Sequence, residues 1–307
     1  MAPRRLFPRR PMSVLNRVEG MPFRWSINPY RGCSHGCHFC YARPTHTFLG
    51  FHADDSFQHN IIVKRNAAEV LYRELKGGKW KGGEVALGTA TDPYQPAEGR
   101  WKVTRSILEV LRDFRIPTRI TTRSPLIQRD TDLLREMNLL SVNISLSTLD
   151  ERVWRLTEPA SPHPKQRLET VRKLNQSGIP AGLFMAPILP YLSDTDEQLR
   201  IYMVAAKESG ARFVMPSVLR LQPAVKSWFF RRIQPFFPEA YPRLVRLYEG
   251  TYPPDEYRSE LLQRVRRHKR DIGFRDEEIG SRRNSAEGHE AGKEDRLQEE
   301  WIQLSLF

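Results

Sequence analysis

Short apolar runs alternate with amphipathic segments from about Trp25 to about Leu221, and this alternation predicts repeated strand–helix units. The runs that resemble strands lie at residues 26–31, 84–89, 118–122, 142–147, 181–187 and 212–218. Strands that alternate with helices favour a parallel sheet with right-handed crossovers. We therefore expect an α/β fold built from six such units.

Three helices have clear signals in the sequence. Residues 103–114 repeat apolar side chains on one face of a helix. Residues 194–208 form a second helix, which Ser193 is expected to cap and Gly210 to end. A third helix is predicted at residues 254–270, inside a segment rich in arginine and aromatic residues.

The pattern changes at both ends of the chain. Residues 1–22 are rich in Arg and Pro with little periodicity, which predicts a basic extended arm and no packed element. Residues 23–222 hold the strand–helix units. Residues 223–274 predict a helical extension, suited either to base stacking and phosphate contact or to a small cap with a solvated basic face. Residues 275–300 predict a charged disordered tether that leads to a terminal peptide, 301–307.

The composition is typical of a globular cytoplasmic enzyme, and its charge favours polyanions as binding partners. The 307-residue chain is 39% hydrophobic, and none of its apolar runs reaches the roughly 18 residues that a membrane span needs. The N-terminal arginines are not followed by an apolar segment, so a signal peptide is not indicated. The 49 Lys and Arg against 36 Asp and Glu give a net charge of +13, which favours nucleic acid as a partner.

All cysteine in the chain lies in one loop after the first predicted strand, as Cys33, Cys37 and Cys40. An odd number of cysteines in a cytoplasmic chain argues against a structural disulfide and points to metal or redox chemistry. Thiolates on one loop can converge on a compact metal centre. A cubane iron–sulfur cluster needs four ligands, so three cysteines would leave one iron without a protein ligand.

Two other readings of the cysteine loop stay open at this point. Three cysteines with His35, His38 or His46 are able to bind zinc. Cys37 and Cys40 alone are spaced like the pair of a thioredoxin-like redox site.

The C-x3-C-x2-C spacing, with Phe39 before the last cysteine, resembles the hallmark of the radical S-adenosylmethionine (radical SAM) superfamily. This resemblance implies a partial (β/α)6 TIM-like barrel and a [4Fe–4S] cluster on Cys33, Cys37 and Cys40, with S-adenosylmethionine on the open iron. It also implies that one electron, from a flavodoxin- or ferredoxin-type reductant, cleaves the sulfonium C–S bond. The 5′-deoxyadenosyl radical so formed would abstract a substrate hydrogen, while the protein supplies orientation.

Within the superfamily, the chain is similar to the spore photoproduct lyase-like branch, DNA repair enzymes that reverse a thymine dimer lesion. The similarity extends over about residues 26–220, and it is carried by residues 33–41, 89–98, 145–150, 158–159 and 167–168.

Several of these residues follow predicted strands, at the edge where parallel α/β folds place their ligands. The resemblance implies that Thr91 and Asp92 meet the methionine ammonium, and that Ser145 or Ser147 meets the ribose or carboxylate. Arg167 would pair with the carboxylate through charge-assisted hydrogen bonds. Ordinary capping or turn chemistry is the alternative for each of these polar residues.

Three further residues complete the expected site. Phe39 and Ile188 are expected to wall the adenine. The lyases use an additional cysteine to return a hydrogen atom to the product radical, and this sequence has no fourth cysteine. Tyr41, next to the last cluster cysteine, is the candidate for a radical relay, with simple packing as the alternative. The termination step is therefore expected to differ from that of the lyases.

The last residues resemble the bacterial sliding-clamp-binding motif. Gln303, Leu304, Leu306 and Phe307 match its pattern, behind a charged linker. A short peptide on a flexible tether can insert its apolar residues into a pocket and so raise the local concentration of the enzyme at the clamp. The alternative is a tail that folds back onto the enzyme.

Three functions compete on this sequence. A radical SAM enzyme acting in DNA repair at or near replication explains the branch resemblance, the basic charge and the terminal peptide together. RNA modification agrees with the charge and the fold but leaves the clamp motif unexplained. A non-catalytic iron–sulfur sensor tethered to the clamp would not form 5′-deoxyadenosine.

Overall fold

The structure is a computed structural model and describes residues 4–274. Within this range the main sheet has the strand order β10-β9-β8-β7-β6-β3-β2. All neighbours pair in parallel except β2, which runs antiparallel to β3. The strands are β2 (Asn16–Arg17), β3 (Trp25–Ile27), β6 (Val85–Leu87), β7 (Thr118–Thr122), β8 (Leu139–Ser145), β9 (Ala181–Ile188) and β10 (Val214–Val218). The predicted parallel α/β fold is confirmed, whereas closure into a partial barrel stays a prediction.

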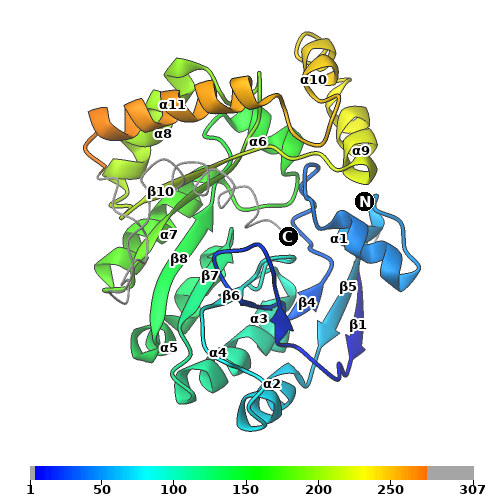
Figure 1. Ribbon diagram of the computed structural model, residues 1–307, viewed down its shortest axis with the longest axis vertical. Helices are drawn as coiled ribbons and strands as arrows, with labels where there is room; N and C mark the ends of the chain where they lie inside the picture. The colour runs from blue at the N-terminus through cyan, green and yellow to red at the C-terminus, as the bar shows by residue number, and fades with distance from the viewer. Residues whose placement is uncertain (1–3, 275–307) are drawn as a thin grey trace.

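Helices join these strands, and four of them form a row beside the sheet. The joining helices are α2 (Ala67–Lys76), α3 (Ala97–Trp101), α4 (Val103–Asp113), α5 (Thr131–Glu136), α6 (Glu151–Thr157), α7 (Pro164–Gln176) and α8 (Asp196–Glu208), with the 3-10 helix η2 (Pro125–Asp130). In Figure 1, α2, α4, α5 and α7 follow one another along the lower left of the strands. No helix of residues 4–274 is long and apolar enough to cross a membrane.

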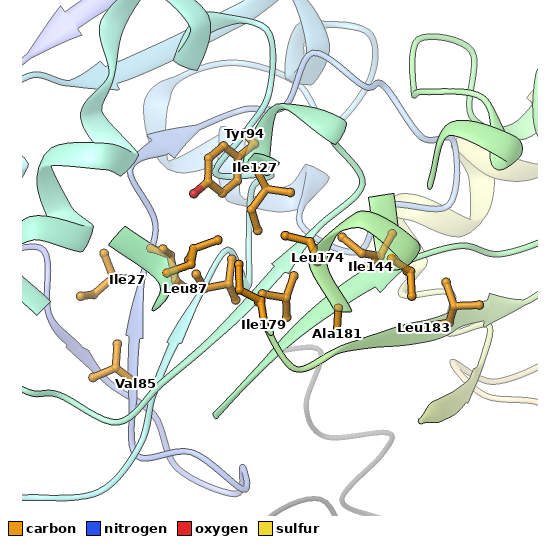
Figure 2. Close-up of a cluster of buried hydrophobic side chains, with 14 of the residues drawn as sticks. Ile27, Val85, Leu87, Tyr94, Ile127, Ile144, Leu174, Ile179, Ala181 and Leu183 are labelled. Atoms are coloured by element: carbon orange, nitrogen blue, oxygen red, sulfur yellow. The ribbon is translucent and has the colours of Figure 1, made fainter. Parts of the chain in front are cut away.

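The core lies between the sheet and this row of helices. The side chains of Ile27, Leu87, Ile144 and Leu183, from β3, β6, β8 and β9, are fully buried and lie in a row across Figure 2. Every residue of β9 except Pro187 is buried, which is typical of a parallel strand covered on both faces. The apolar run at 181–187 therefore corresponds to a strand that is buried on both sides.

Some element boundaries differ from the predicted ones. The first predicted strand, 26–31, is divided between β3 and β4 (Tyr30–Arg31), which belong to different sheets. The fourth predicted strand ends at Ser145, so Ser147 lies in the loop that follows. Helix α8 is capped by Thr195, not by Ser193, because the Ser193 hydroxyl instead accepts a 2.9 Å hydrogen bond from the Leu189 N–H.

The expectation that residues 1–22 form no packed element is wrong. Strand β1 (Arg5–Arg9) pairs in parallel with β5 (Asn60–Lys64), and β4 pairs with the other edge of β5. Val14 and Leu15 are buried, and their N–H groups donate to the Glu74 carboxylate at 3.2 and 2.9 Å. The segment is extended as predicted, but it covers a strand edge that would otherwise be open.

The C-terminal extension consists of α9 (Pro223–Ile233), α10 (Tyr241–Leu247) and α11 (Asp255–Asp271). Helix α11 lies against α8 and β10, and α9 lies against α6 and the 3-10 helix η1 (Arg43–Leu49). Figure 1 shows α9, α10 and α11 along the top of the molecule, on the side opposite α2. The predicted tether, 275–300, and the terminal peptide, 301–307, lie outside the described residues.

Candidate active site

The cysteine loop connects β4 to η1 and is folded tightly. Cys33 and Cys37 are buried, Cys40 is half-buried, and none is in a disulfide. Gly32 opens the loop with a φ of +76°, and a Cβ at this position would lie 2.7 Å from the Asn60 carbonyl oxygen. Only glycine fits there without strain, since both the backbone angle and the space exclude a side chain.

The segment after β6 holds the first half of the loop. The Gln95 amide donates to the Gly32 carbonyl at 3.1 Å and accepts from the Ser34 N–H at 3.0 Å. The His35 ring bridges two elements, with Nε2 at 3.3 Å from Asp92 Oδ2 and Nδ1 at 3.2 Å from the Ala160 carbonyl. The loop is thereby fixed to the carboxyl ends of the central strands.

Arg43, the first residue of η1, holds the second half of the loop from inside the protein. Its guanidinium, which is fully buried, donates to the carbonyls of Gly36 at 2.7 Å, Cys37 at 3.0 Å and Asp54 at 2.6 Å. The same guanidinium lies 5.0 Å from the ring of Trp228, on α9. The C-terminal extension therefore packs directly beneath the cysteine loop.

The thiols lack the electrostatic environment of a free redox pair. Burial raises the pKa of Cys33 well above its ordinary range, and burial raises the pKa of Cys37 to about 12. A reactive thioredoxin-like cysteine needs a depressed pKa, so the redox-pair reading is not supported. A bound metal would displace the protons of these thiols, since metal binding and deprotonation are coupled.

The zinc reading gains no support from the geometry. Within residues 4–274, no three His, Cys, Asp or Glu side chains are grouped to hold one metal ion. A cubane cluster is different, because each thiolate binds a separate iron atom. The three thiols nevertheless lie close enough for each to influence the charge of the others.

A buried carboxylate lies between two arginines at the ends of β7 and β8. Glu158 accepts from Arg167 Nη2 at 2.7 Å and from Arg123 Nε at 3.2 Å, and the Ser147 hydroxyl donates to its other oxygen. Burial alone would raise the pKa of Glu158, but Arg167 and Arg123 hold it down at about 2. Glu158 therefore stays ionised and orients both guanidinium groups.

Arg167 does not face the open side of this site. It is fully buried, and its remaining donors go to Ser161 and to the carbonyls of Pro162 and Ser145. The role as carboxylate partner that the sequence suggests for Arg167 fits Arg123 better. Arg123 follows β7, raises the ionised fraction of Cys37 by its charge, and lies 5.9 Å from the Phe39 ring.

Asp92 is likewise turned into the protein. Its carboxylate accepts from the Tyr94 N–H at 2.8 Å, the Thr122 hydroxyl at 2.6 Å and the Arg123 N–H at 2.7 Å. Burial alone would raise the pKa of Asp92, but His35 and these hydrogen bonds lower it to about 2. Asp92 thus anchors the cysteine loop, as the turn-chemistry alternative describes, and its contact with an ammonium group stays a prediction.

The remaining predicted residues lie at the same edge of the sheet. Phe39 packs with Leu189, just beyond the end of β9, and Ile188 is the last residue of that strand. The Tyr41 hydroxyl donates to the Thr89 carbonyl, after β6. Thr91 is buried, and its hydroxyl oxygen has no hydrogen-bond partner among the described residues. Ser145 ends β8 and is buried, whereas Ser147 is committed to Glu158.

Sequence reasoning missed four residues of this site. They are Arg43, Gln95, Arg123 and Asn28, whose side-chain oxygen accepts from the Ala90 N–H at 2.8 Å. The sequence does carry a signal for Arg123, since this residue directly follows the predicted strand 118–122. Arg43, Gln95 and Asn28 form hydrogen bonds with backbone groups, and no pattern of residues in the sequence predicts such contacts.

A parallel α/β sheet that carries a three-cysteine loop at its carboxyl edge defines a class of iron–sulfur enzyme. The family model described as the Radical SAM superfamily matches residues 27–201, more than half of the chain. The chain belongs to this superfamily, and the protein is a radical SAM enzyme. The family implies a [4Fe–4S] cluster and S-adenosylmethionine as its cofactors.

Relatives of known sequence occur in bacteria, archaea and a virus. An uncharacterized protein of Mycobacterium tuberculosis strain H37Rv is 37% identical over 260 residues, which cover 82% of this chain and 76% of that protein. An uncharacterized protein of Methanocaldococcus jannaschii is 25% identical over 252 residues, covering 82% and 89%. One from Acidianus two-tailed virus is 32% identical over 204 residues, covering 64% and 67%.

Solved structures of spore photoproduct lyase share the fold. A variant with bound AdoMet and dinucleoside spore photoproduct gives a TM-score of 0.63 at 16% identity, covering 87% of this chain and 79% of the lyase. The lyase complexed with dinucleoside spore photoproduct gives 0.62 at 17% identity over the same shares. Identities this low show the fold alone.

The residues present fit the cofactors that the family implies. The loop supplies three cysteine thiols, and the sequence has no fourth cysteine. The Thr91 hydroxyl is buried and has no hydrogen-bond partner among the described residues, and a polar ligand at this edge would supply one. Arg123, held by Glu158, supplies a cation beside the thiols.

Proposed function

We propose that this radical SAM enzyme acts on nucleic acid and repairs a lesion in DNA, at replication sites that it reaches through the sliding clamp. The observation that carries the proposal is that arginines lie against aromatic rings beside the cysteine loop: the Arg123 guanidinium is 5.9 Å from the Phe39 ring, and that of Arg220, after β10, is 5.3 Å from the Tyr252 ring. Cations with aromatic rings suit phosphates and bases. The net charge of +13 and the lyase-like fold support the same substrate class.

The chain's own residues have distinct tasks in this proposal. Cys33, Cys37 and Cys40 would hold the cluster, which with S-adenosylmethionine supplies one-electron C–S cleavage and hydrogen abstraction. Arg123 would bind the carboxylate of S-adenosylmethionine, since Glu158 already fixes its orientation. Thr91 would accept from the ammonium group through its buried hydroxyl oxygen.

The adenine side of the pocket and the framework of the site involve the other predicted residues. Phe39 and Ile188 would wall the adenine, because both are buried, Phe39 in the cysteine loop and Ile188 at the end of β9. Ser145 would contact the ribose. Asp92 and Arg167 act as positioning residues, because their polar atoms are already occupied within the protein.

Tyr41 is our candidate for the hydrogen donor that replaces the missing fourth cysteine. Burial raises the pKa of Tyr41, so the phenol keeps its hydrogen at neutral pH. In the proposed step the O–H bond breaks homolytically and the hydrogen atom passes to the product radical. The tyrosyl radical then regains an electron from the flavodoxin- or ferredoxin-type reductant and a proton from water.

Clamp coupling is the part of the proposal that residues 303–307 carry, and these lie outside the described residues. Deleting them is expected to abolish binding to purified sliding clamp and to leave S-adenosylmethionine cleavage unchanged. Unchanged clamp affinity in the deletion variant, or no clamp affinity in the intact chain, would refute clamp coupling.

The substrate is tested by following 5′-deoxyadenosine formation. Reduced, reconstituted enzyme is incubated with lesion-bearing DNA, undamaged DNA of the same sequence, and RNA, with a Cys37→Ala variant as the inactive control. We expect lesion-bearing DNA to increase 5′-deoxyadenosine above the level without substrate. Stimulation by RNA alone would favour RNA modification, and formation in none of the reactions would favour the non-catalytic sensor.

A further inference from the structure

Arginines and tyrosines alternate from the cysteine loop to the C-terminal helices. Arg220 follows β10 and lies near enough to Tyr41 for its positive charge to lower the pKa of that phenol, against the larger rise caused by burial. The ring of Tyr252 lies 5.3 Å from the Arg220 guanidinium and 5.4 Å from that of Arg258, on α11. All four side chains are partly exposed. They therefore form a continuous cationic and aromatic surface that starts at the cysteine loop.

Tyr191 extends this surface from the loop after β9. Its ring is partly exposed, and the Arg243 guanidinium on α10 lies 3.9 Å from the ring centroid. The Tyr257 ring meets it edge to face, at 5.9 Å between centroids. One aromatic face is thus supported by neighbours from two C-terminal helices.

The backbone around Tyr191 is fixed in an unusual conformation. Its φ of +61° lies in the left-handed region, which a bulky residue rarely adopts. The buried Asp194 stabilises this arrangement, since one of its oxygens accepts from the Tyr191 N–H at 2.8 Å and the other accepts from the Tyr257 hydroxyl. Such over-determined, unfavourable backbone conformations occur mainly at functional sites. The Tyr191 ring is thereby held in place before any ligand arrives.

We infer that Tyr191, Arg243, Tyr252 and Arg220 form a binding track for an unpaired strand of DNA. Bases would stack on Tyr191 and Tyr252, and the phosphates between them would lie against the two arginines. Base stacking on an aromatic side chain tolerates any sequence and leaves the lesion to be recognised nearer the cysteine loop. A base that is chemically altered inside a protein must first leave its stack, which makes an unpaired strand the fitting ligand.

The inference rests on the proposed nucleic-acid substrate, and it assigns that substrate a path over the enzyme. It also assigns the two interpretations of residues 223–274, a cap and a nucleic-acid contact surface, to different helices of this segment. Trp228 and Phe229 of α9 are buried and act as a cap, whereas α10 and α11 present their arginines and tyrosines beside the sheet edge.

The test measures the affinity of the reconstituted full-length enzyme for fluorescent, lesion-free oligonucleotides of single-stranded DNA, duplex DNA and RNA. Tyr191→Ala is expected to weaken binding to single-stranded DNA by about tenfold, the size of one lost stacking contact. Arg243→Ala is expected to weaken it about fivefold and to lower the salt dependence by about one phosphate contact.

Three control variants separate the track from general effects. Tyr191→Phe keeps the ring and is expected to bind within about twofold of the wild type. Arg246→Ala removes the same charge from an exposed position of α10. Tyr72→Ala removes a tyrosine that is 47% exposed on α2, at the opposite side of the molecule in Figure 1. Both alanine controls are expected to change affinity by less than about twofold.

The outcomes distinguish this inference from the function on which it rests. Wild-type binding to single-stranded DNA that Tyr191→Ala and Arg243→Ala leave unchanged would overturn the track but leave DNA as the substrate. Equal losses of affinity in Arg243→Ala and Arg246→Ala would show that binding depends only on overall positive charge, and would also overturn the track. A wild type that binds RNA alone, or no oligonucleotide, would overturn the track together with the proposed DNA substrate. Because Arg243 is exposed, its variant is expected to fold whatever Tyr191→Ala does.

Discussion

Removing the Arg43 guanidinium is expected to disorganise the cysteine loop more than any surface change of the same charge. The side chain is fully buried and donates to the carbonyls of Gly36, Cys37 and Asp54 at 2.6–3.0 Å. In Arg43→Ala these carbonyls lose their donor in a place that water reaches poorly. Each buried acceptor left without a partner costs about 1–3 kcal/mol. Two of the carbonyls belong to the cysteine loop itself, so we expect a loss of about 3–5 kcal/mol in the free energy of unfolding.

The assay is urea unfolding of the reconstituted enzyme, together with its iron content. Arg172→Ala is the matched control, because Arg172 pairs with Glu169 at 2.7 Å on the surface, where the two side chains are 47% and 43% exposed. Surface pairs of this kind contribute about 0.5 kcal/mol. Arg43→Ala is also expected to retain less than about half of the wild-type iron, since metal binding and loop folding are coupled. If Arg43→Ala matched Arg172→Ala in both stability and iron, the loop would not depend on Arg43.

Three further changes probe other parts of the site. Gly32→Ala is expected to lose most of its iron in the same assay, because its Cβ would lie 2.7 Å from the Asn60 carbonyl oxygen at a φ of +76°; a full iron content would contradict this. Trp228→Ala is expected to lower the free energy of unfolding by about 3 kcal/mol, as large-to-small core changes do, and a change below 1 kcal/mol by urea unfolding would show that α9 does not support the loop. Because the folded-state pKa of Glu158, about 2, lies below its ordinary value near 4.5, its ionisation stabilises the protein above about pH 4.5 and this contribution disappears as pH falls toward 2. Glu158→Gln is therefore expected to be less stable than the wild type at pH 7. On acidification its free energy of unfolding is expected to fall by on the order of 3 kcal/mol less than that of the wild type. Parallel stability–pH curves for the two proteins would refute the buried-carboxylate account.

The sequence predicted the parts of the fold that hydrophobic patterning controls. The strands of the parallel sheet, helix α4 and the start of the C-terminal extension at Pro223 all lie near their predicted positions. Strand β1 escaped prediction because the segment 5–9 gains its structure only by pairing with β5, more than fifty residues later in the chain. Such long-range pairing leaves little periodicity in the sequence itself.

The sequence points to the proposed metal ligands more directly than to the polar residues around them. Spacing alone identifies Cys33, Cys37 and Cys40, because three thiols on one short loop have few structural uses. Whether a buried polar residue faces a ligand or a backbone group depends on side-chain direction, which spacing does not encode. For that reason Arg167 and Asp92, expected at the cofactor, hold other residues in place within the protein, whereas Arg123, which spacing did not single out, is partly exposed beside the thiols.

Cofactor analysis of the reconstituted enzyme tests the central claim most directly. Iron, acid-labile sulfide and zinc are measured on the same anaerobic sample, and 5′-deoxyadenosine is then followed after reduction in the presence of S-adenosylmethionine. We predict about four iron and four sulfide per chain, with 5′-deoxyadenosine that disappears in Cys37→Ala. One zinc per chain without sulfide, and no 5′-deoxyadenosine from the wild type, would contradict the account.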